Sequence, residues 1–159
     1  MEMVRLLLVC AAIPVVASAA GFSLTIGPPA AAGTGARVTK TKSAVLAVRL
    51  EECDKLDTAQ ISGTEEGIVD GARMSAPVTL SVAESPGVYV VSPVLSQSQG
   101  VWVVNISATC GSARAGAIVP IEAGIGGAGF LRERIKYFPR PATKAEIDAA
   151  LKALRGPVN

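Results

Sequence analysis

The stretch GVWVVNISATC, which runs from Gly100 to Cys110, carries the clearest strand pattern in the chain. Successive side chains of a β-strand point to opposite faces of its sheet. Trp102, the only tryptophan, therefore shares one face with Cys110, whereas the polar Asn105 lies on the other face. We expect a half-buried strand with Trp102 in the core, and the rest of the sequence must supply the sheet around it.

Short alternating runs of the same kind recur from Gly21 to Glu122, separated by turns rich in Gly, Pro and Ser. The predicted strands are Phe22–Ile26, Ser43–Cys53, a short one near Ala59–Gly63 that is followed by a bend, Pro77–Glu84, Val88–Pro93, the Trp102 strand and Ala117–Glu122. In the last of these, Pro120 favours a sheet edge or a bulge. Strands at this spacing predict an all-β fold, an immunoglobulin-like antiparallel β-sandwich over residues 21–122.

The chain changes character after the sandwich. Residues 123–129 are rich in glycine and are expected to form a linker. Residues 130–159 form a basic amphipathic tail that contains the best helix pattern in the sequence. Thr143 and Glu146 have the spacing of a capping box, and Gly156 is placed to end the helix. The fold prediction is therefore a sandwich with a C-terminal α-helical tail.

The tail is the part of the chain that we expect to carry function. Its candidate partner-binding residues are Arg132, Arg134, Lys136, Ile147, Leu151 and Leu154. A helix of this length is marginal alone in water, so its apolar stripe must pack on something. The favoured surface is the chain's own sandwich. The alternative is a groove on a partner or an anionic membrane surface, and membrane contact is the less favoured of these because the tail has no Trp.

The first residues indicate the compartment. Residues 1–20 have the basic start, the short apolar stretch and the small residues of a secretory signal peptide. We therefore expect a secreted or periplasmic protein. Cys10 would leave with the signal, and the remaining pair, Cys53 and Cys110, is expected to form a disulfide in an oxidising space. The alternative is two buried free thiols. Cys53 falls on the polar face of its strand, so the strand must bulge or end near Glu52 for the bridge to form.

Catalysis is not expected, because the chain has no His and so lacks the commonest general base. The paired carboxylates at Glu51 and Glu52, and at Glu65 and Glu66, are expected to be solvated. No cofactor or metal is expected either, since imidazole ligands are absent and there are only three Met. The net charge of +2 is too small to indicate a nucleic-acid partner.

The segment SPGVYVV…GVWVVNISA, which covers Ser85–Ala108, resembles small bacterial secreted immunoglobulin-like domains of the YtkA-like and FixH-like kind. The resemblance rests on Gly87, Tyr89, Gly100 and Trp102. It implies an exported sandwich with Tyr89 and Trp102 in the core, and it implies no site. A copper role, which some of these families have, would need His and Met ligands that this chain lacks.

Together these features predict an exported, non-catalytic β-sandwich that binds another protein or serves as a structural component of the envelope. The alternative is an inhibitor or assembly factor that docks on an enzyme or a membrane complex through its C-terminal tail. The sequence leaves the oligomeric state open.

Overall fold

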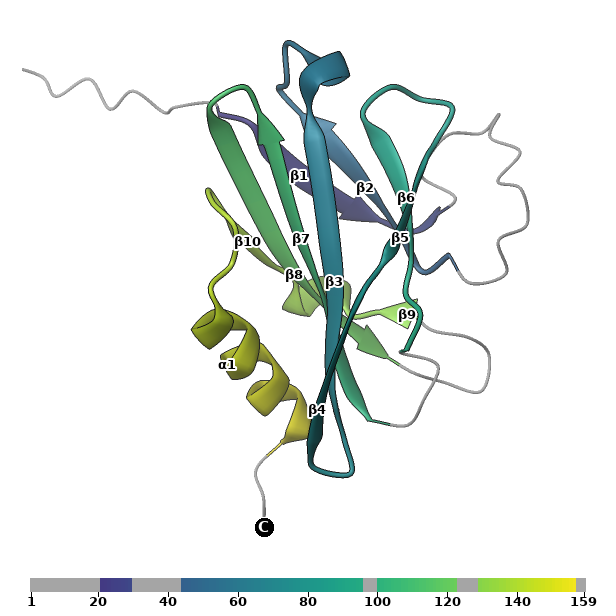
Figure 1. Cartoon of the computed structure of the whole chain (residues 1–159), viewed down its shortest axis with the longest axis vertical. Coiled ribbons are helices and arrows are strands. Elements are labelled where there is room, and N and C mark those ends of the chain that lie inside the picture. Colours follow the sequence, from purple (N-terminus) through teal and green to yellow (C-terminus); the bar gives the residue numbers. More distant parts are fainter. Residues whose placement is uncertain (1–20, 30–43, 96–99, 123–128, 157–159) are drawn as a thin grey trace, which may run out of the picture.

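The computed structural model describes residues 21–29, 44–95, 100–122 and 129–156. It is a sandwich of two antiparallel sheets with one helix on its outer side (Figure 1). The strands are β1 (Ser23–Gly27), β2 (Leu46–Glu51), β3 (Gln60–Val69), β4 (Ala72–Pro77), β5 (Thr79–Val82), β6 (Val88–Ser92), β7 (Val101–Cys110), β8 (Ala113–Glu122), β9 (Gly129–Phe130) and β10 (Lys136–Phe138). The helices are the 3-10 turns η2 (Leu56–Thr58) and η3 (Arg132–Arg134) and the α-helix α1 (Lys144–Arg155).

The order of the strands is that of an immunoglobulin-like domain, as predicted. One sheet is four-stranded in the order β1-β2-β6-β5, and the other is six-stranded, with β10-β8-β7-β3-β4 in order and β9 beside β8. This reproduces the A-B-E-D and G-F-C-C′ arrangement of the immunoglobulin fold. β9 and β10 are additions to the free edge of β8, and they continue the sheet beyond the predicted sandwich end at Glu122.

The core between the sheets is built around Trp102, which is only 1% exposed. Trp102 pairs across the strands with Gly67 of β3, and a Cβ at Gly67 would overlap the indole ring. The indole therefore lies flat over a position that only glycine can occupy. Tyr89 of β6 is half-buried and packs against the same core. In this fold the buried Trp is commonly on strand C, whereas here it is on β7, the equivalent of strand F.

The β3–β4 hairpin corrects the sequence-based prediction of a short strand and a bend. β3 runs on to Val69 and is joined to Ala72 by a tight turn at Asp70 and Gly71, which both have positive φ, 49° and 82°. This is the geometry of a two-residue hairpin turn, for which Asp-Gly is a preferred sequence. The chain then crosses from one sheet to the other between β4 and β5, where the Val78 amide donates to the Gly63 carbonyl.

The disulfide between Cys53 and Cys110 is confirmed, and it ties the end of β2 to the end of β7. β2 ends at Glu51, and Glu52 takes a left-handed conformation with φ 57°. That break in the alternation turns Cys53 toward Cys110, as its position on the polar face of the strand required. These are the strands that the inter-sheet bridge joins in antibody domains.

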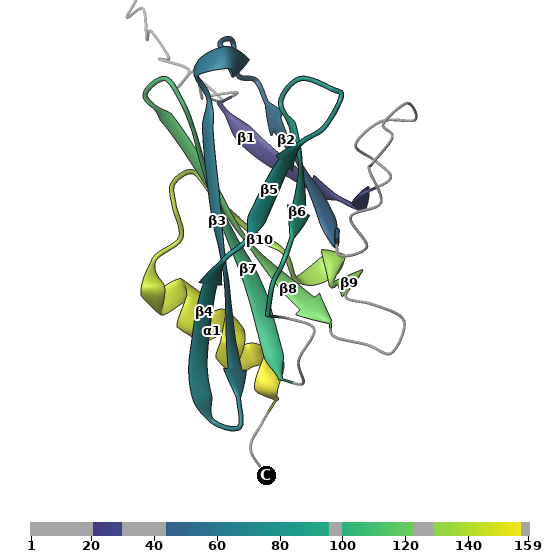
Figure 2. The ribbon, with the colours of Figure 1, turned by 45° about the vertical axis from the view of Figure 1, so that its right-hand side comes forward.

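The tail packs on the outer face of the six-stranded sheet, the favoured alternative of the sequence analysis (Figure 2). Ile147, Ala150 and Leu151 of α1 are buried against Val103 of β7 and Ile118 of β8. The helix covers the outward side of strands whose inward side forms the main core. Both faces of β7 and β8 are therefore buried where α1 lies.

Pro120 lies at a gap in the edge of the sheet, in agreement with the expectation of an edge or bulge. β9 pairs with β8 at residues 121–122 and β10 at residues 116–118, so neither short strand pairs with Pro120. The Pro120 carbonyl faces this gap and accepts from the Leu131 amide. Its ring nitrogen, which has no hydrogen to donate, faces the same side of the strand.

The predicted signal peptide, residues 1–20, lies outside the described residues, as do residues 123–128 of the predicted linker. Gly129, the last residue of that linker, belongs to β9. In the described part of the chain, no helix has the length and apolar character needed to cross a bilayer.

Candidate binding grooves beside the C-terminal helix

A shallow groove of about 290 Å³ runs between α1 and the segment that carries η3 and β10. We call it the tail groove. Its apolar lining is Pro120, Ile135, Ala150, Ala153 and Leu154, and its charged lining is Glu133, Arg134 and Lys136. The groove is built from residues of β8, η3, β10 and α1, so its shape depends on the docked position of the tail.

The structure divides the predicted partner-binding residues into two sets. Arg134, Lys136 and Leu154 meet in the tail groove, and Arg132 lies beside it on η3. Ile147 and Leu151 lie beneath the helix, 5% and 0% exposed, where they hold α1 to the sheet. In the docked structure these two side chains stabilise the fold and are not accessible to a partner.

The start of α1 is fixed by its predicted capping box. The Thr143 hydroxyl accepts from the Glu146 amide at 3.3 Å, and the Glu146 carboxylate accepts from the Thr143 amide at 2.7 Å. Arg140 donates to both oxygens of the same carboxylate, at 2.9 and 2.8 Å. Arg140, and after it the Thr143 amide, lower the pKa of Glu146 from 4.5 to about 2. The carboxylate is thus ionised at neutral pH and holds the chain that leads into the helix.

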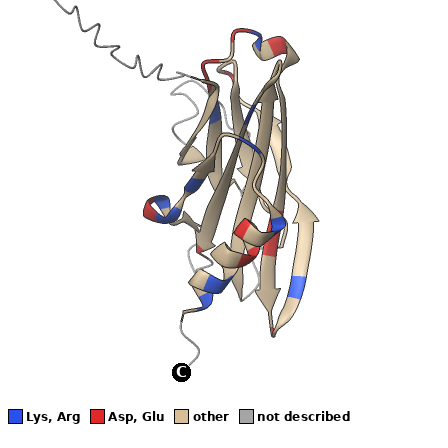
Figure 3. Cartoon of the chain, turned by 90° about the vertical axis from the view of Figure 1, so that its left-hand side faces the viewer, with Lys and Arg blue, Asp and Glu red and all other residues tan. Residues whose placement is uncertain are grey.

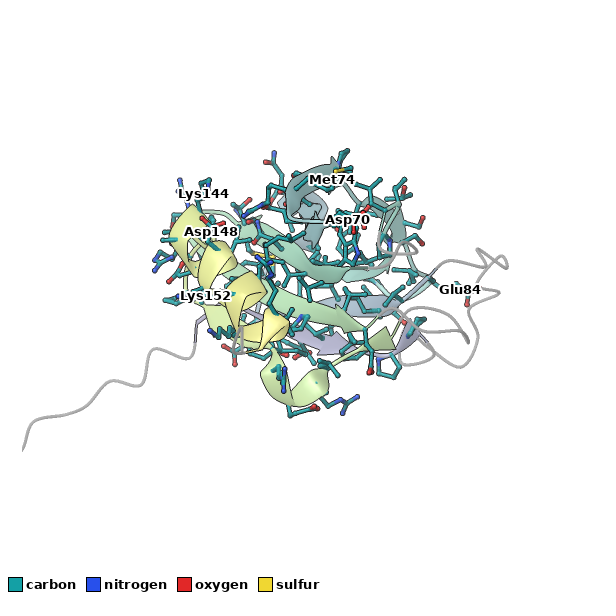
Figure 4. The ribbon with its side chains drawn as sticks, turned by 90° about the horizontal axis from the view of Figure 1, so that it is seen from below. Asp70, Met74, Glu84, Lys144, Asp148 and Lys152 are labelled. Carbon is teal, nitrogen blue, oxygen red and sulfur yellow. A yellow bond between two sulfur atoms is a disulfide. The ribbon has the colours of Figure 1, made fainter. Side chains whose placement is uncertain are left out.

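A second groove, of about 570 Å³, lies on the other side of α1, against the β3–β4 hairpin. We call it the hairpin groove. Its lining is Ile68 and Leu151, which are apolar, the glycine at 156, and the charged Arg73, Asp148, Lys152 and Arg155. Figure 4 shows Asp148 and Lys152 on one side of the helix, together with Lys144. The two grooves therefore flank the last turns of α1.

An ion-pair network links the two sides of the hairpin groove, the β3–β4 hairpin and α1. Arg73 donates to Glu66 of β3 and to Asp148 of α1, so one guanidinium ties the hairpin to the helix. Lys144 donates to the other oxygen of Asp148 at 2.9 Å. Lys144 and then Arg73 lower the pKa of Asp148, and the two carboxylates, Glu66 first, raise the pKa of Arg73. The network contains two cations and two anions and is balanced.

Glu65 corrects the expectation that the paired carboxylates are solvated. Its side chain is 0% exposed, because Glu65 is on the inward face of β3. The carboxylate accepts from the amides of Val94, at 2.6 Å, and Leu95, which follow β6. Glu66, its neighbour on the outward face, joins the network with Arg73. Alternation along β3 thus gives adjacent carboxylates two different structural roles.

Charge is unevenly spread over the molecule although the net charge is small (Figure 3). Acidic residues gather around η2 and the end of β2, at Glu51, Glu52, Asp54 and Asp57. Of the cations that form no ion pair within the described part of the chain, Lys55 and Arg114 lie near the disulfide. The others lie around the two grooves: Arg132, Arg134, Lys136, Lys152 and Arg155. Among the described residues, no cluster of acidic or Cys side chains is suited to hold a metal ion.

No family model matches the chain, and no curated protein or solved structure shows significant similarity to it. The fold therefore defines the class, an immunoglobulin-like β-sandwich closed by a disulfide. The resemblance to YtkA-like and FixH-like domains stays a prediction.

Proposed function

We propose that this chain is an exported, non-catalytic immunoglobulin-like domain that binds another protein through the tail groove. The disulfide and the signal-like first residues support export, because such bridges persist mainly in oxidising compartments. The absence of His from the sequence supports a binding role over an acid–base enzyme.

The observation that carries the proposal is the composition of the tail groove. Small apolar side chains, Ala150 and Ala153, leave a recess beside Leu154. Arg134 and Lys136 border this recess and form no ion pair in the described residues. Apolar recesses that receive an anchoring side chain, with polar groups around them, are typical of protein-binding sites. The tail is held on its own sheet, so the groove needs little ordering before a partner binds.

The test is a quantitative pull-down from an envelope extract with the wild-type protein and two variants. Ala153→Trp fills the groove from an exposed position, so it should abolish capture of the partner while leaving the melting temperature almost unchanged. Val82→Trp is the matched control, because Val82 is 76% exposed on β5, in the other sheet. Capture that survives Ala153→Trp, or that is lost equally with Val82→Trp, would contradict the proposal. Turnover of general hydrolase substrates by the purified protein would contradict its non-catalytic part.

A further inference from the structure

The charged residues that line the hairpin groove include more cations than its ion pairs use. Its single acidic residue, Asp148, is already paired with Lys144 and with Arg73. Arg73 is in turn paired with Glu66. Lys152 and Arg155 remain, and neither forms an ion pair with any described residue. The groove therefore presents two positive charges that no described acidic residue balances, beside an apolar lining.

The negative C-terminal end of the α1 macrodipole balances only part of this positive charge. Cations in the last turn of a helix are stabilised by its macrodipole, which is equivalent to about half a negative charge. Lys152 and Arg155 supply two full charges in that turn. Most of the positive potential is thus left for an external anion. Both residues are exposed, so their side chains can turn toward a ligand without breaking an ion pair to a described residue.

The apolar lining specifies what else the ligand must carry. Leu151 lines the groove but is 0% exposed, so the apolar side chain that a ligand can contact is Ile68 of β3, which is half-buried. A volume of about 570 Å³ is enough for one large aliphatic side chain with the chain on either side of it. The hairpin, tied to α1 through Arg73, forms a fixed wall.

We propose that the hairpin groove binds an acidic segment of a partner protein. An aliphatic side chain of the segment packs on Ile68, and its carboxylates pair with Lys152 and Arg155. The inference rests on the proposed function in that the chain binds protein, but it uses the other side of α1 from the tail groove. A partner could therefore engage either groove without the other.

The test uses a short synthetic peptide of alternating Glu and Leu, labelled for fluorescence anisotropy, and the full chain. Binding should weaken with added salt, and the version with Lys in place of Glu should not bind. In a methyl NMR titration of the isoleucine and leucine residues, the largest shift should be at Ile68. The double variant Lys152→Glu with Arg155→Glu should weaken binding about tenfold or more, since two attractions become repulsions. Lys152→Gln with Arg155→Gln, which introduces no anion at the helix end, should weaken it less.

The matched control is Lys55→Glu with Arg114→Glu, which changes the net charge equally at exposed positions near the disulfide. It should leave the affinity unchanged. Equal loss in the control, absence of peptide binding, or methyl shifts elsewhere would overturn the inference. So would phosphatidylglycerol vesicles that shift the Ile68 methyls when the peptide does not. In any of these cases, loss of the natural partner in Ala153→Trp alone would still uphold the proposed function.

Discussion

Gly116→Ala is the sharpest test of how the tail is held on the sandwich. Gly116 is in β8 and faces outward, under the chain that connects β10 to α1. A Cβ at this position would lie 2.5 Å from the Arg140 carbonyl oxygen and 3.2 Å from the Ala142 nitrogen. These atoms belong to the backbone and cannot turn aside, so the whole connection must shift. Gly116 pairs with Phe138 of β10, which would move with it.

Two estimates give the expected decrease in the free energy of unfolding for Gly116→Ala. Forcing an extra carbon into a well-packed site costs about 1–3 kcal/mol when the surroundings relax. Complete release of the helix would expose Ile147 and Leu151, which are 5% and 0% exposed. Their burial contributes about 1.5–3 kcal/mol each. The cost of Gly116→Ala should therefore be about 1–3 kcal/mol, which is less than the roughly 3–6 kcal/mol that exposure of these two side chains alone would cost.

Urea unfolding measures this cost, and amide NMR of α1 shows whether the helix has moved. Gly129→Ala is the matched control, because Gly129 also lies beside β8 but a Cβ there would meet nothing within 4 Å. The control should be neutral or more stable by up to about 1 kcal/mol, since alanine restricts the unfolded chain. If Gly116→Ala is as stable as the control and α1 keeps its chemical shifts, the close approach of the tail is refuted.

Four further outcomes are expected. Replacing Cys53 and Cys110 by Ser should lower the free energy of unfolding by about 4 kcal/mol, because the bridge closes a separation of 57 residues, and denaturation with and without reductant measures it. Glu65→Leu should cost about 1–3 kcal/mol for each loop amide that it leaves unpaired, with faster hydrogen exchange of those amides. Trp102→Ala should cost about 3–5 kcal/mol, and the native indole emission should be blue-shifted. The Glu146 pKa is lowered in the fold from 4.5 to about 2, so its stabilisation is complete above pH 4.5 and is lost as the pH falls toward 2. Melting curves of Glu146→Gln should lack this acid-dependent component.

The sandwich could be predicted because the burial of one face of a strand leaves an alternating pattern of apolar and polar residues in the local sequence. In β7 the apolar Val104, Ile106 and Ala108 alternate with the polar Asn105, Ser107 and Thr109, which is the period of a strand with one face in the core. Val103, on the outward face, breaks this pattern because α1 covers it. The helix was predictable for the same reason. The capping box of Thr143 and Glu146 and the stripe at Ile147 and Leu151 are local patterns, and each is present in the structure.

The β3–β4 hairpin was missed although a local signal existed. Asp70 and Gly71, flanked by Val69 and Ala72, are an Asp-Gly turn between two runs that can form strands. The run before it is weak as a strand, because Glu65 points inward where an apolar residue is expected. This carboxylate accepts from amides that follow β6, about 30 residues away in sequence. Tertiary contacts of this kind leave no pattern in the local sequence.

The grooves could not be found from the sequence, because each is made by elements that meet only after folding. Arg134 and Leu154 share the tail groove, and Arg73 and Lys152 share the hairpin groove. The sequence could identify the tail as basic and amphipathic, but not which of its residues the sandwich would cover. That depends on the outward face of β7 and β8, which is apolar only where α1 lies on it.

Residues of α1 that dock the helix on the sheet are thus distinct from the exposed residues that border the grooves, although the two sets are mixed in the sequence. Ile147 and Leu151 belong to the stripe that binds α1 to the sheet, and their substitution would remove the walls of both grooves together with the docking energy. Ala153 and Lys152 are exposed, one on each side, so they can be changed with little effect on the free energy of unfolding. A loss of binding in variants of the first pair reports only that the tail has been released. A loss of binding in variants of the second pair, with an unchanged melting temperature, is the result that assigns a partner to a particular groove.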